Sequence, residues 1–389
     1  KLLAAEKEKI SYLEKLLDGV EVEWKPLGGL AQNLDSMRKP ITSGLRESGE
    51  IPYYGASGIV DYVKDYIFDG DFLLVSEDGA NLVARNTPIA FSISGKSWVN
   101  NHAHILKFNT YVERRFVDIY LNSIDLTPYI SGAAQPKLNQ KNLNCIQIPI
   151  PCPDNPKKSL EIQAEIVRIL DTFTELTTEL TTELTARKKQ YNYYREKLLT
   201  EVYDSTKEFT IGDILDMRAG KNIKAKDIAE TETSEHKYTC YGGNGSRGFV
   251  SNYSHEGNYV LIGRQGALCG NVKRAKGKFY ATEHAVACSP KDGINIDWVF
   301  YMLTFMNLNQ YKSKSAQPGL AVGNIAKLPI KVPPFEEQTR IVAILDKFDT
   351  LTSSITEGLP REIALRQKQY EYYRDLLLSF PKPNTEVAA

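Results

Sequence analysis

The sequence predicts an α+β protein in which two similar globular domains are joined by two long helices, packed as an antiparallel coiled coil with pseudo-two-fold symmetry. Three observations lead to this prediction. A long amphipathic helical pattern occurs twice, the segments before these helices repeat at a constant offset, and each repeated segment mixes strand and helix patterns. Because the period is about 180 residues, it indicates a domain duplication and not a solenoid.

The first long helix is predicted from Leu160 to Tyr203. Its single apolar face needs a partner helix to cover it. At 1.5 Å per residue the helix extends about 65 Å, long enough to hold two objects apart. Its apolar residues recur mostly at steps of three and four, which places them on one helical face: Ile162, Ile166, Ile169, Phe173, Leu176, Leu180, Leu184, Tyr191, Tyr194 and Leu198.

The second long helix is predicted from Gln338 to Phe380, because this segment repeats the first. IVRILD at 166–171 matches IVAILD at 341–346, and QYNYYR at 190–195 matches QYEYYR at 369–374. Two head-to-tail copies satisfy a pseudo-two-fold axis only if the helices are antiparallel, so Phe173 is expected near Tyr370 and not near Phe348. Pro360 is expected to kink or break this helix. The predicted seam contains Ile166, Phe173, Leu176, Leu180, Leu184, Tyr191, Ile341, Phe348 and Tyr370.

The duplication extends into the globular segments at an offset of 182: His102 corresponds to His284, and Ala134-Gln135-Pro136 to Ala316-Gln317-Pro318. The predicted organisation has five parts. They are an N-terminal helix and lead-in at 1–23, a first globular domain at 24–159, a central helix at 160–208, a second globular domain at 209–335, and a C-terminal helix with tail at 336–389.

Within the first domain, β-branched and aromatic runs predict strands at 59–62, 72–75 and 89–93, and a helical pattern covers 115–122. The alternating segment 146–151 ends in proline and predicts a last strand that leaves the domain. The second domain closes in the same way at 328–334. The N-terminal helix is predicted over 1–17, since YLEKLL at 12–17 resembles YREKLL at 194–199.

The composition is that of a globular protein, with 42% hydrophobic and 25% charged residues. No apolar run reaches the roughly 20 residues of a membrane span, and no signal peptide opens the chain, so a cytoplasmic location without membrane contact is expected. Five cysteines without a C-x-x-C pair indicate reduced thiols and no zinc site. Net charge is zero, but 209–333 holds 16 basic against 10 acidic side chains, a modest lean toward phosphate.

Catalytic motifs are largely absent. Gly242-Gly-Asn-Gly245 lacks the Lys-Ser/Thr of a phosphate-binding loop, so a plain turn is favoured. Pro333-Pro-Phe335 resembles the end of an adenine methyltransferase signature, but Val332 replaces its asparagine and no glycine-rich cofactor motif precedes it. The five histidines form no metal-binding spacing, and the coincidence of His102 with His284 favours hydrogen-bonded structural histidines.

Several motifs together carry a family resemblance. They are SYLEKLL at 11–17, IPIPCPDNP at 148–156, the Thr-Glu-Leu tetrads from 174 to 185, and RKKQYNYYR at 187–195. The chain closely resembles the specificity subunit of type I DNA restriction and modification systems, in the subfamily with four-residue Thr-Ala-Glu-Leu-type repeats.

This resemblance implies a non-catalytic subunit whose two target-recognition domains each read half of a bipartite sequence in double-stranded DNA. It implies that the helices set the spacer length and dock two methyltransferase subunits, joined by endonuclease and translocase subunits. It implies no cofactor in this chain, with S-adenosylmethionine bound by the methyltransferase partners. The alternative from the residues alone is a coiled-coil assembly scaffold whose globular domains bind protein.

If two similar domains read different half-sites, base contacts belong where the copies differ. Alignment of Gly79 with Gly266 sets Glu77-Asp78 against Arg264-Gln265. Arginine pairs with guanine, glutamine with adenine, and an acidic side chain accepts from cytosine N4. An exposed loop beside a shared glycine also varies freely, so drift is the competing explanation.

Further DNA-contact candidates are basic. Lys273, Arg274, Lys276 and Lys278 form either a phosphate-contacting strand or a solvated hairpin face. The remaining candidates are Lys221, Lys224 and Arg247 in the second domain, and Arg38, Lys39, Asn81, Arg85 and Lys96 in the first.

Overall fold

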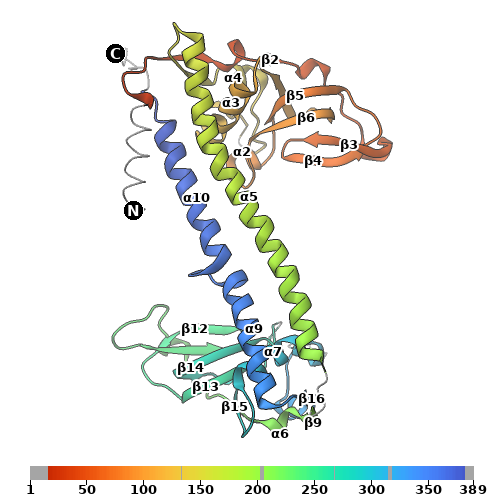
Figure 1. Ribbon diagram of the computed structural model, residues 1–389, viewed down its shortest axis with the longest axis vertical. Coiled ribbons are helices and arrows are strands. Elements are labelled where there is room, and N and C mark those ends of the chain that lie inside the picture. The colour runs from red at the N-terminus through yellow and green to blue at the C-terminus, as the bar shows by residue number, and fades with distance from the viewer. Residues whose placement is uncertain (1–15, 133, 202–205, 267, 314–317, 382–389) are drawn as a thin grey trace. The chain divides into compact units, whose positions relative to one another are not determined.

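A computed structural model describes residues 16–132, 134–201, 206–266, 268–313 and 318–381 (Figure 1). The chain divides into two compact units, one formed by residues 1–179 and 363–389 and the other by residues 180–362. Of the predicted N-terminal helix, all but Leu16 and Leu17 lies outside the described residues.

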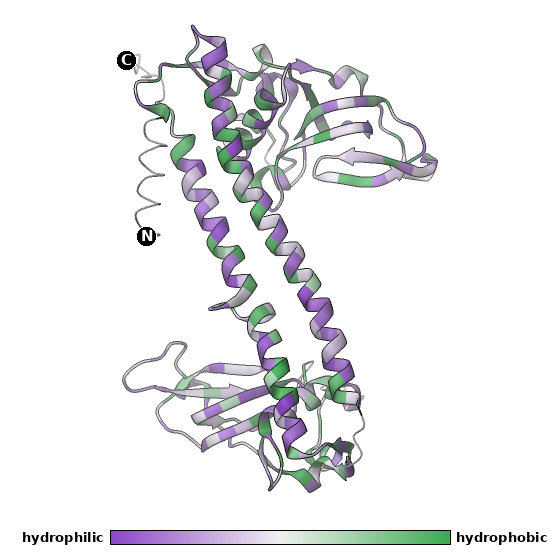
Figure 2. Ribbon diagram, in the orientation of Figure 1, coloured by the Kyte–Doolittle hydropathy of each residue, from purple (hydrophilic) through white to green (hydrophobic). Residues whose placement is uncertain are grey.

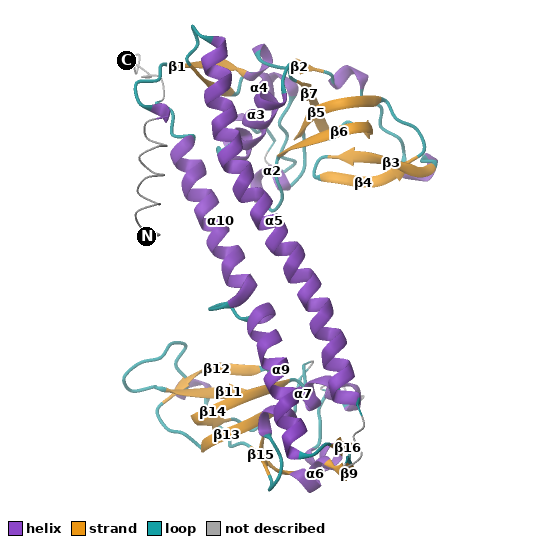
Figure 3. Ribbon diagram, in the orientation of Figure 1, coloured by secondary structure: helices purple, strands orange, loops and turns teal. Residues whose placement is uncertain are grey.

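The first unit is built on a six-stranded sheet covered by α3 (Figure 3). β3 pairs in parallel with β6, and the other neighbours are antiparallel. The strands, in spatial order, are β2 (Gln32–Asn33), β7 (Ala103–Lys107), β5 (Phe68–Ser76), β6 (Ala90–Val99), β3 (Ser48–Gly55) and β4 (Gly58–Val63). A separate antiparallel pair joins β1 (Val22–Pro26) and β8 (Gln147–Pro151). The helices are α2 (Asn81–Ala84), α3 (Tyr111–Ser123) and α4 (Gln140–Asn144).

The second unit repeats this topology. Its sheet, in spatial order, contains β10 (Leu215–Ala219), β15 (Ala285–Pro290), β13 (His255–Gly263), β14 (Val272–Ala281), β11 (Tyr238–Gly242) and β12 (Gly245–Val250). β9 (Lys207–Thr210) pairs with β16 (Pro329–Val332). The helices are α6 (Ile211–Ile214), α7 (Ile296–Phe305) and α8 (Val322–Ala326). Short 3-10 turns complete the two units at Leu27–Gly29, Asp35–Met37, Ser43–Leu45, Thr127–Tyr129, Ala225–Asp227 and Leu308–Tyr311.

The identical strand order confirms the duplication that the sequence predicts. Even a detail of the hairpins is shared: Gly70 faces Gly95 across β5 and β6, and Gly257 faces Gly277 across β13 and β14. All four glycines have positive φ, which other residues adopt only with strain. The predicted strands at 59–62, 72–75 and 89–93 fall on β4, β5 and the start of β6, and the predicted helix falls on α3.

Local sequence explains the ends of the main helices. Thr110 and Glu113 form a capping box at the start of α3, with each side chain bonded to the other's backbone N–H. α5 (Pro156–Thr200) starts with a proline, which has no N–H to satisfy in a first turn. Asn155 Oδ1 accepts the backbone N–H of Lys158 at 3.1 Å. The helix therefore begins four residues before the predicted start at Leu160.

The C-terminal segment is two helices, α9 (Phe335–Ser353) and α10 (Gly358–Leu377). The second helical segment is therefore interrupted near Pro360, as the sequence predicts, and is not one continuous helix. The break precedes the proline, which lies in the first turn of α10, where it is tolerated. Gly358 has φ +76°, and a Cβ there would collide with the carbonyl oxygen of Thr350.

The helix packing inside each unit is antiparallel, as predicted. In the first unit the ring of Phe173 in α5 stacks on Tyr373 in α10 at 5.2 Å, close to the expected neighbour Tyr370. In the second unit Tyr191 and Tyr194 of α5 contact Phe348 of α9 at 6.1 and 5.8 Å. Figure 2 shows polar and apolar residues interleaved along these helices, as expected for a narrow seam.

The ends of the seam merge with the globular cores. Ile166 is fully buried in the core of the first unit, against which Phe173 and Tyr370 also pack. Ile341 is fully buried in the core of the second unit, against which Tyr191 packs. Leu176, Leu180 and Leu184 are half-buried. Among the described residues, no helix is long and apolar enough to cross a membrane.

Candidate DNA interface

The two units place residues 77 and 264 at the same backbone position. The N–H of Glu77 donates to the carbonyl of His102 at 2.9 Å, and the N–H of Arg264 donates to that of His284 at 2.9 Å. The carbonyls of these two residues accept from Leu138 and Leu320 at 2.7 and 2.8 Å. The alignment of Glu77-Asp78 with Arg264-Gln265 is thus a structural equivalence.

In the second unit this position lies beside an open depression of about 500 Å³, called here the turn pocket. The pocket forms between the β11–β12 turn, the segment after β13 and the turn before β15. Gly263 and Gly243 pack so closely that a Cβ on Gly263 would collide with the Gly243 carbonyl. The lining residues are Gly243, Asn244, Arg247, Gln265, Gly266, Leu268 and His284.

Side chains around the turn pocket have unused hydrogen-bonding capacity. Buried polar atoms are normally paired, yet four atoms of His284, which lines the pocket, and of residues next to the lining in sequence have no partner among the described residues: Arg264 Nε, Thr282 Oγ1, Glu283 Oε2 and His284 Nδ1. No ion pair or hydrogen bond engages the side chains of Arg247, Arg264 or Gln265 in the described part of the chain. Lys273 extends beside Gly245 at the pocket rim, with its Cε 3.5 Å from the ideal Cβ position. The pocket therefore offers donors to a polar ligand.

The basic strand 273–278 does not form one patch. β14 keeps an unbroken register with β13, so side chains alternate between faces, and Lys273 lies opposite Arg274, Lys276 and Lys278. Arg274 was predicted to contact phosphate, but its guanidinium pairs with Asp346 and Asp297, both at 3.0 Å. The structure therefore corrects this prediction.

Lys278 and its counterpart Lys96 share a surrounding in both units. The Lys278 ammonium lies 4.8 Å from the Tyr253 ring centroid, and Lys96 lies 4.6 Å from that of Tyr66. Lys278 also pairs loosely with Glu256 at 3.9 Å. Both lysines were predicted from the sequence as DNA contacts, whereas the tyrosines were not. Tyr66 and Tyr253 are 187 positions apart, and an alignment of the two segments at that offset pairs them.

In the first unit, Arg38 and Glu77 were both predicted to contact DNA, but their side chains bind each other instead. Arg38 donates to Glu77 at 2.6 Å and to the Ala103 carbonyl at 2.8 Å, and their side chains are only 13% and 11% exposed. Glu77 also pairs with Lys137 at 3.1 Å. Burial opposes ionisation of Glu77, but the Arg38 hydrogen bond and the charge of His104 outweigh it, so its pKa lies below the ordinary value. Glu77 is thus a structural anion, not a reader of cytosine.

Two more candidates of the first unit are also engaged internally. The Asn81 side chain bridges the backbone of Thr87, donating to its carbonyl and accepting from its N–H, both at 3.0 Å. The Arg85 guanidinium donates to the Ile124 carbonyl at 2.7 Å, and burial lowers its pKa. Lys39 remains exposed. Asp78 pairs with the exposed His102 at 2.9 Å, so the position equivalent to Gln265 carries an acid–histidine pair.

Lys221 and Lys224 lie in the loop after β10. The N–H of Lys221 donates to the Ala281 carbonyl at 2.9 Å, which holds this loop against the end of β14. Burial and the positive charge of Lys221 lower the pKa of His255, whose ring stacks on Phe279 at 5.2 Å. Lys224 is exposed.

A group with metal-ligand spacing occurs in the first unit at Asp35, Glu77 and His104. His104 Nδ1 faces Asp35 at 2.6 Å and Nε2 faces the Leu138 carbonyl at 2.7 Å. Both nitrogens meet oxygen acceptors, so neither offers a lone pair to a metal ion. Arg38 and Lys137 already neutralise the carboxylates. The group is an ion-pair network that ties β7 to the segments on either side.

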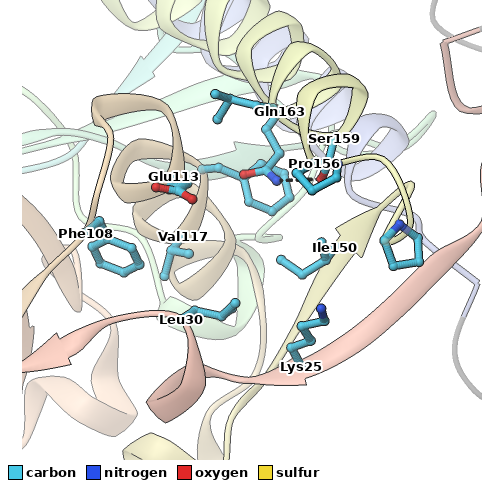
Figure 4. A pocket seen from close by; sticks show the side chains of 12 residues that line it. Lys25, Leu30, Phe108, Glu113, Val117, Ile150, Pro156, Ser159 and Gln163 are labelled. Atoms are coloured by element: carbon cyan, nitrogen blue, oxygen red, sulfur yellow. Dashed lines mark hydrogen bonds between the residues drawn. The ribbon is translucent and has the colours of Figure 1, made fainter.

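A partly open pocket of about 290 Å³ lies in the first unit, where α3 approaches the first turns of α5 (Figure 4). Its wall is mainly apolar, with Phe108, Val117 and Ile150. Its polar groups have structural tasks: Glu113 caps α3, and Gln163 donates to Ser159 at 3.1 Å.

Comparison with known proteins follows the same division into two. Residues 19–188 and 203–365 each match the sequence model of the type I restriction modification DNA specificity domain. The Escherichia coli type I restriction enzyme EcoprrI specificity subunit is 46% identical over 379 residues, covering 90% of this chain and 93% of that protein. A putative type I restriction enzyme specificity subunit of Haemophilus influenzae is 39% identical, covering 96% of this chain and 100% of the other.

A solved structure shares the fold. The type I restriction-modification S subunit from M. genitalium aligns with a TM-score of 0.66 at 17% identity, covering 94% of this chain and 98% of that one. The duplicated sheet topology, the antiparallel helix packing within each unit and the double match to one domain family lead to a single conclusion. The chain belongs to the type I restriction modification DNA specificity family, as a specificity subunit with two target-recognition domains.

Proposed function

We propose that this specificity subunit reads a bipartite sequence in double-stranded DNA, one half with each globular domain, and has no active site of its own. The observation that carries the proposal is the turn pocket. At two consecutive backbone positions of a duplicated scaffold, the second unit presents Arg264 and Gln265, whose side chains have no ion pair or hydrogen bond within the described residues. The first unit presents Glu77, which is bound by Arg38, and Asp78, which pairs with His102. Two readers of different half-sites need such differing chemistry on a common frame.

Within the second unit we assign base reading to Arg264, Gln265 and Arg247, whose donors suit purine edges in the major groove. Lys273 at the rim, and Lys221 and Lys224 beyond it, supply charge for phosphates. Lys96 and Lys278 occupy equivalent positions in the two units, as expected for phosphate contacts that are independent of sequence. Lys39 is the remaining basic candidate of the first unit.

We further propose that the helices dock two methyltransferase subunits, which bring S-adenosylmethionine, and that endonuclease and translocase subunits join this core in the cytoplasm. This chain also aligns, with a TM-score of 0.52, with a solved chain described under complex assembly and conformational transition of the type I R-M system. Duplicated helices with equivalent exposed tyrosines, Tyr193 and Tyr372, are suited to two copies of one partner.

The test is the salt dependence of DNA binding by the assembled complex. Displacement of counterions makes the logarithm of affinity fall linearly with the logarithm of salt concentration, with a slope of about −0.9 per phosphate contact. We expect a slope of several units, and methylated sites with two constant parts around an unread spacer. A slope near zero would instead support the protein-binding scaffold, whose apolar interfaces respond little to salt.

A further inference from the structure

The two units anchor their globular domains to the same aspartate of the repeated helix. Asp171 in IVRILD of α5 and Asp346 in IVAILD of α9 are equivalent. In the first unit Asp171 accepts from Arg115 Nε at 2.8 Å and from the Tyr111 hydroxyl at 3.0 Å. In the second unit Asp346 accepts from Arg274 at 3.0 Å and from the Tyr301 hydroxyl at 2.6 Å.

The arginine, however, comes from a different element in each unit. Arg115 lies on α3, whereas Arg274 lies on the sheet strand β14. At the offset of 182, Arg115 corresponds to Asp297 and Arg274 to Ser92. One unit thus has serine on the strand and arginine on the helix, and the other has arginine on the strand and aspartate on the helix.

Each arginine is fixed by a second set of contacts. Arg115 also pairs with Asp118 at 2.9 Å, and Asp118 accepts from Ser92 at 2.9 Å, so the network reaches the sheet. Arg274 pairs with Asp297 and lies 4.3 Å from the ring centroid of Phe300. Burial and the hydrogen bond to Asp346 raise the pKa of Tyr301, which keeps its hydroxyl a donor. Side chains on both sides of the bond are therefore preorganised.

We propose that Asp171 and Asp346 are positioning residues that fix the orientation of each globular domain on the long helices, and thereby keep the DNA spacer at a single length. The swapped origin of the arginine carries the inference. Residues that merely fill space would vary independently of each other. Here an arginine binds the equivalent aspartate in both units, although it comes from a helix in one unit and from a strand in the other. The inference rests on the proposed reading of a bipartite target.

A domain held loosely on its helix would reach base pairs next to the correct half-site. One base pair is about 3.4 Å of helix axis, so a small rotation of the domain suffices. Asp171→Ala and Asp346→Ala remove the anchor without touching the turn pocket. The matched controls are Glu165→Ala on α5 and Glu337→Ala on α9, whose carboxylates pair with Arg168 and Arg340 of their own helices.

The experiment sequences methylated sites in cells that carry the complete complex. We expect both aspartate variants to keep the two half-sites and to spread the spacer over adjacent lengths, while the controls keep one length. Arg274→Ser should behave like Asp346→Ala, and adding Asp297→Arg should restore one length by recreating the arrangement of the first unit. A single unchanged spacer in both aspartate variants overturns the inference, and so do altered bases within a half-site.

A second readout separates this inference from the proposed function. Hydrogen exchange of the isolated chain should show faster exchange of α7 amides in Asp346→Ala than in Glu337→Ala. Equal exchange in these two variants overturns the anchor. If the unmodified complex methylates sites with no bipartite sequence, the proposed function fails, and the exchange result still decides whether Asp346 holds the domain.

Discussion

Glu77 and Arg264 occupy equivalent backbone positions in the two units, but the first is ion-paired and the second is not. The neighbouring side chains cause this difference. Arg38 and Lys137 bind Glu77 in the first unit, whereas Arg264 meets no partner among the described residues. A charged side chain that is paired within the protein stabilises the fold, whereas an unpaired one is a candidate for binding a ligand. The same residue-scale contrast separates the bound Arg274 from Lys273 at the pocket rim.

Arg264→Ala should relax discrimination at one position of one half-site. A bidentate contact to guanine is worth about 1–3 kcal/mol against the wrong base, so we expect a roughly ten- to hundred-fold loss of selectivity there. The free energy of unfolding should change little, because the Arg264 side chain has no hydrogen-bond partner among the described residues. Sequencing of methylated sites measures the effect. Arg340→Ala, an arginine of α9 that pairs with Glu337, is the control, and identical methylation patterns in both variants would contradict the assignment.

Glu77→Gln should flatten the acid side of the stability profile of the first unit. The pKa of Glu77 is lowered below 4.5, so its contribution is present above that value and is lost as pH falls through the lower folded-state pKa. At pH 7 the variant should be about 3 kcal/mol less stable, since Arg38 and Lys137 lose the negative charge of Glu77. The deficit should shrink below about pH 4. Urea unfolding at several pH values measures this, and the exposed Glu23→Gln should show no such trend.

At the scale of the element, α5 combines a narrow seam with side chains that satisfy themselves. The hydroxyls of Thr174, Thr177, Thr178 and Thr185 donate to carbonyls four residues earlier, at 3.2, 2.8, 2.8 and 2.9 Å. Such bonds satisfy these hydroxyls on the backbone of the helix itself. The repeated pattern of the tetrads is therefore compatible with the proposed role of the helix in setting the spacer.

Deletion of the tetrad Thr178–Thr181 should change the DNA spacer and leave both half-sites unchanged. Four residues shorten a helix by about 6 Å and rotate it by about 40°. A base pair is about 3.4 Å and about 35° of twist, so we expect a change of one or at most two base pairs. Methylated sites of the deleted and full-length proteins would be sequenced. An unchanged spacer with full activity would reject this role, leaving the repeat as a helix-stabilising pattern only.

At the scale of the whole molecule, the duplication works as an internal comparison. Features common to both units include the sheet order, the glycine pairs of the hairpins, and the lysine–tyrosine contacts at Lys96 and Lys278. Features that differ include Arg264 and Gln265 beside the turn pocket of the second unit, where the first unit has Glu77 and Asp78. Shared features support functions that both half-sites need, such as phosphate binding.

Lys96→Glu and Lys278→Glu should each weaken binding to all DNA sequences alike. Each should also reduce the steepness of the salt dependence by about one unit, because a phosphate contact carries no base information. Binding assays at several salt concentrations, with cognate and scrambled duplexes, test both changes. Lys331→Glu on β16 is the control, where an exposed lysine faces Glu208 at 3.8 Å. Loss of affinity for the cognate duplex alone would mean that these lysines read bases.

The sequence by itself determined the duplication, the α+β class, the antiparallel helices and the family, because these depend on periodicity and on repeated motifs tens of residues long. IVRILD with IVAILD and QYNYYR with QYEYYR state the repeat directly. Pro360 predicts a break in the second helix. The exact position of the break, before Gly358, depends on the path of the backbone. Such local rules act along the chain and need no knowledge of distant neighbours.

Only the tertiary structure decided which charged residues are available to a ligand. Arg38 and Glu77 are 39 positions apart, and Arg274 and Asp346 are 72 positions apart, yet each pair is in direct contact. No periodicity marks such pairs, and all four residues look like surface charges in the sequence. Ion pairing over these separations is set by how the sheet packs on its helices, so only the fold separates the candidate DNA-binding residues at the turn pocket from charges that are paired within the protein.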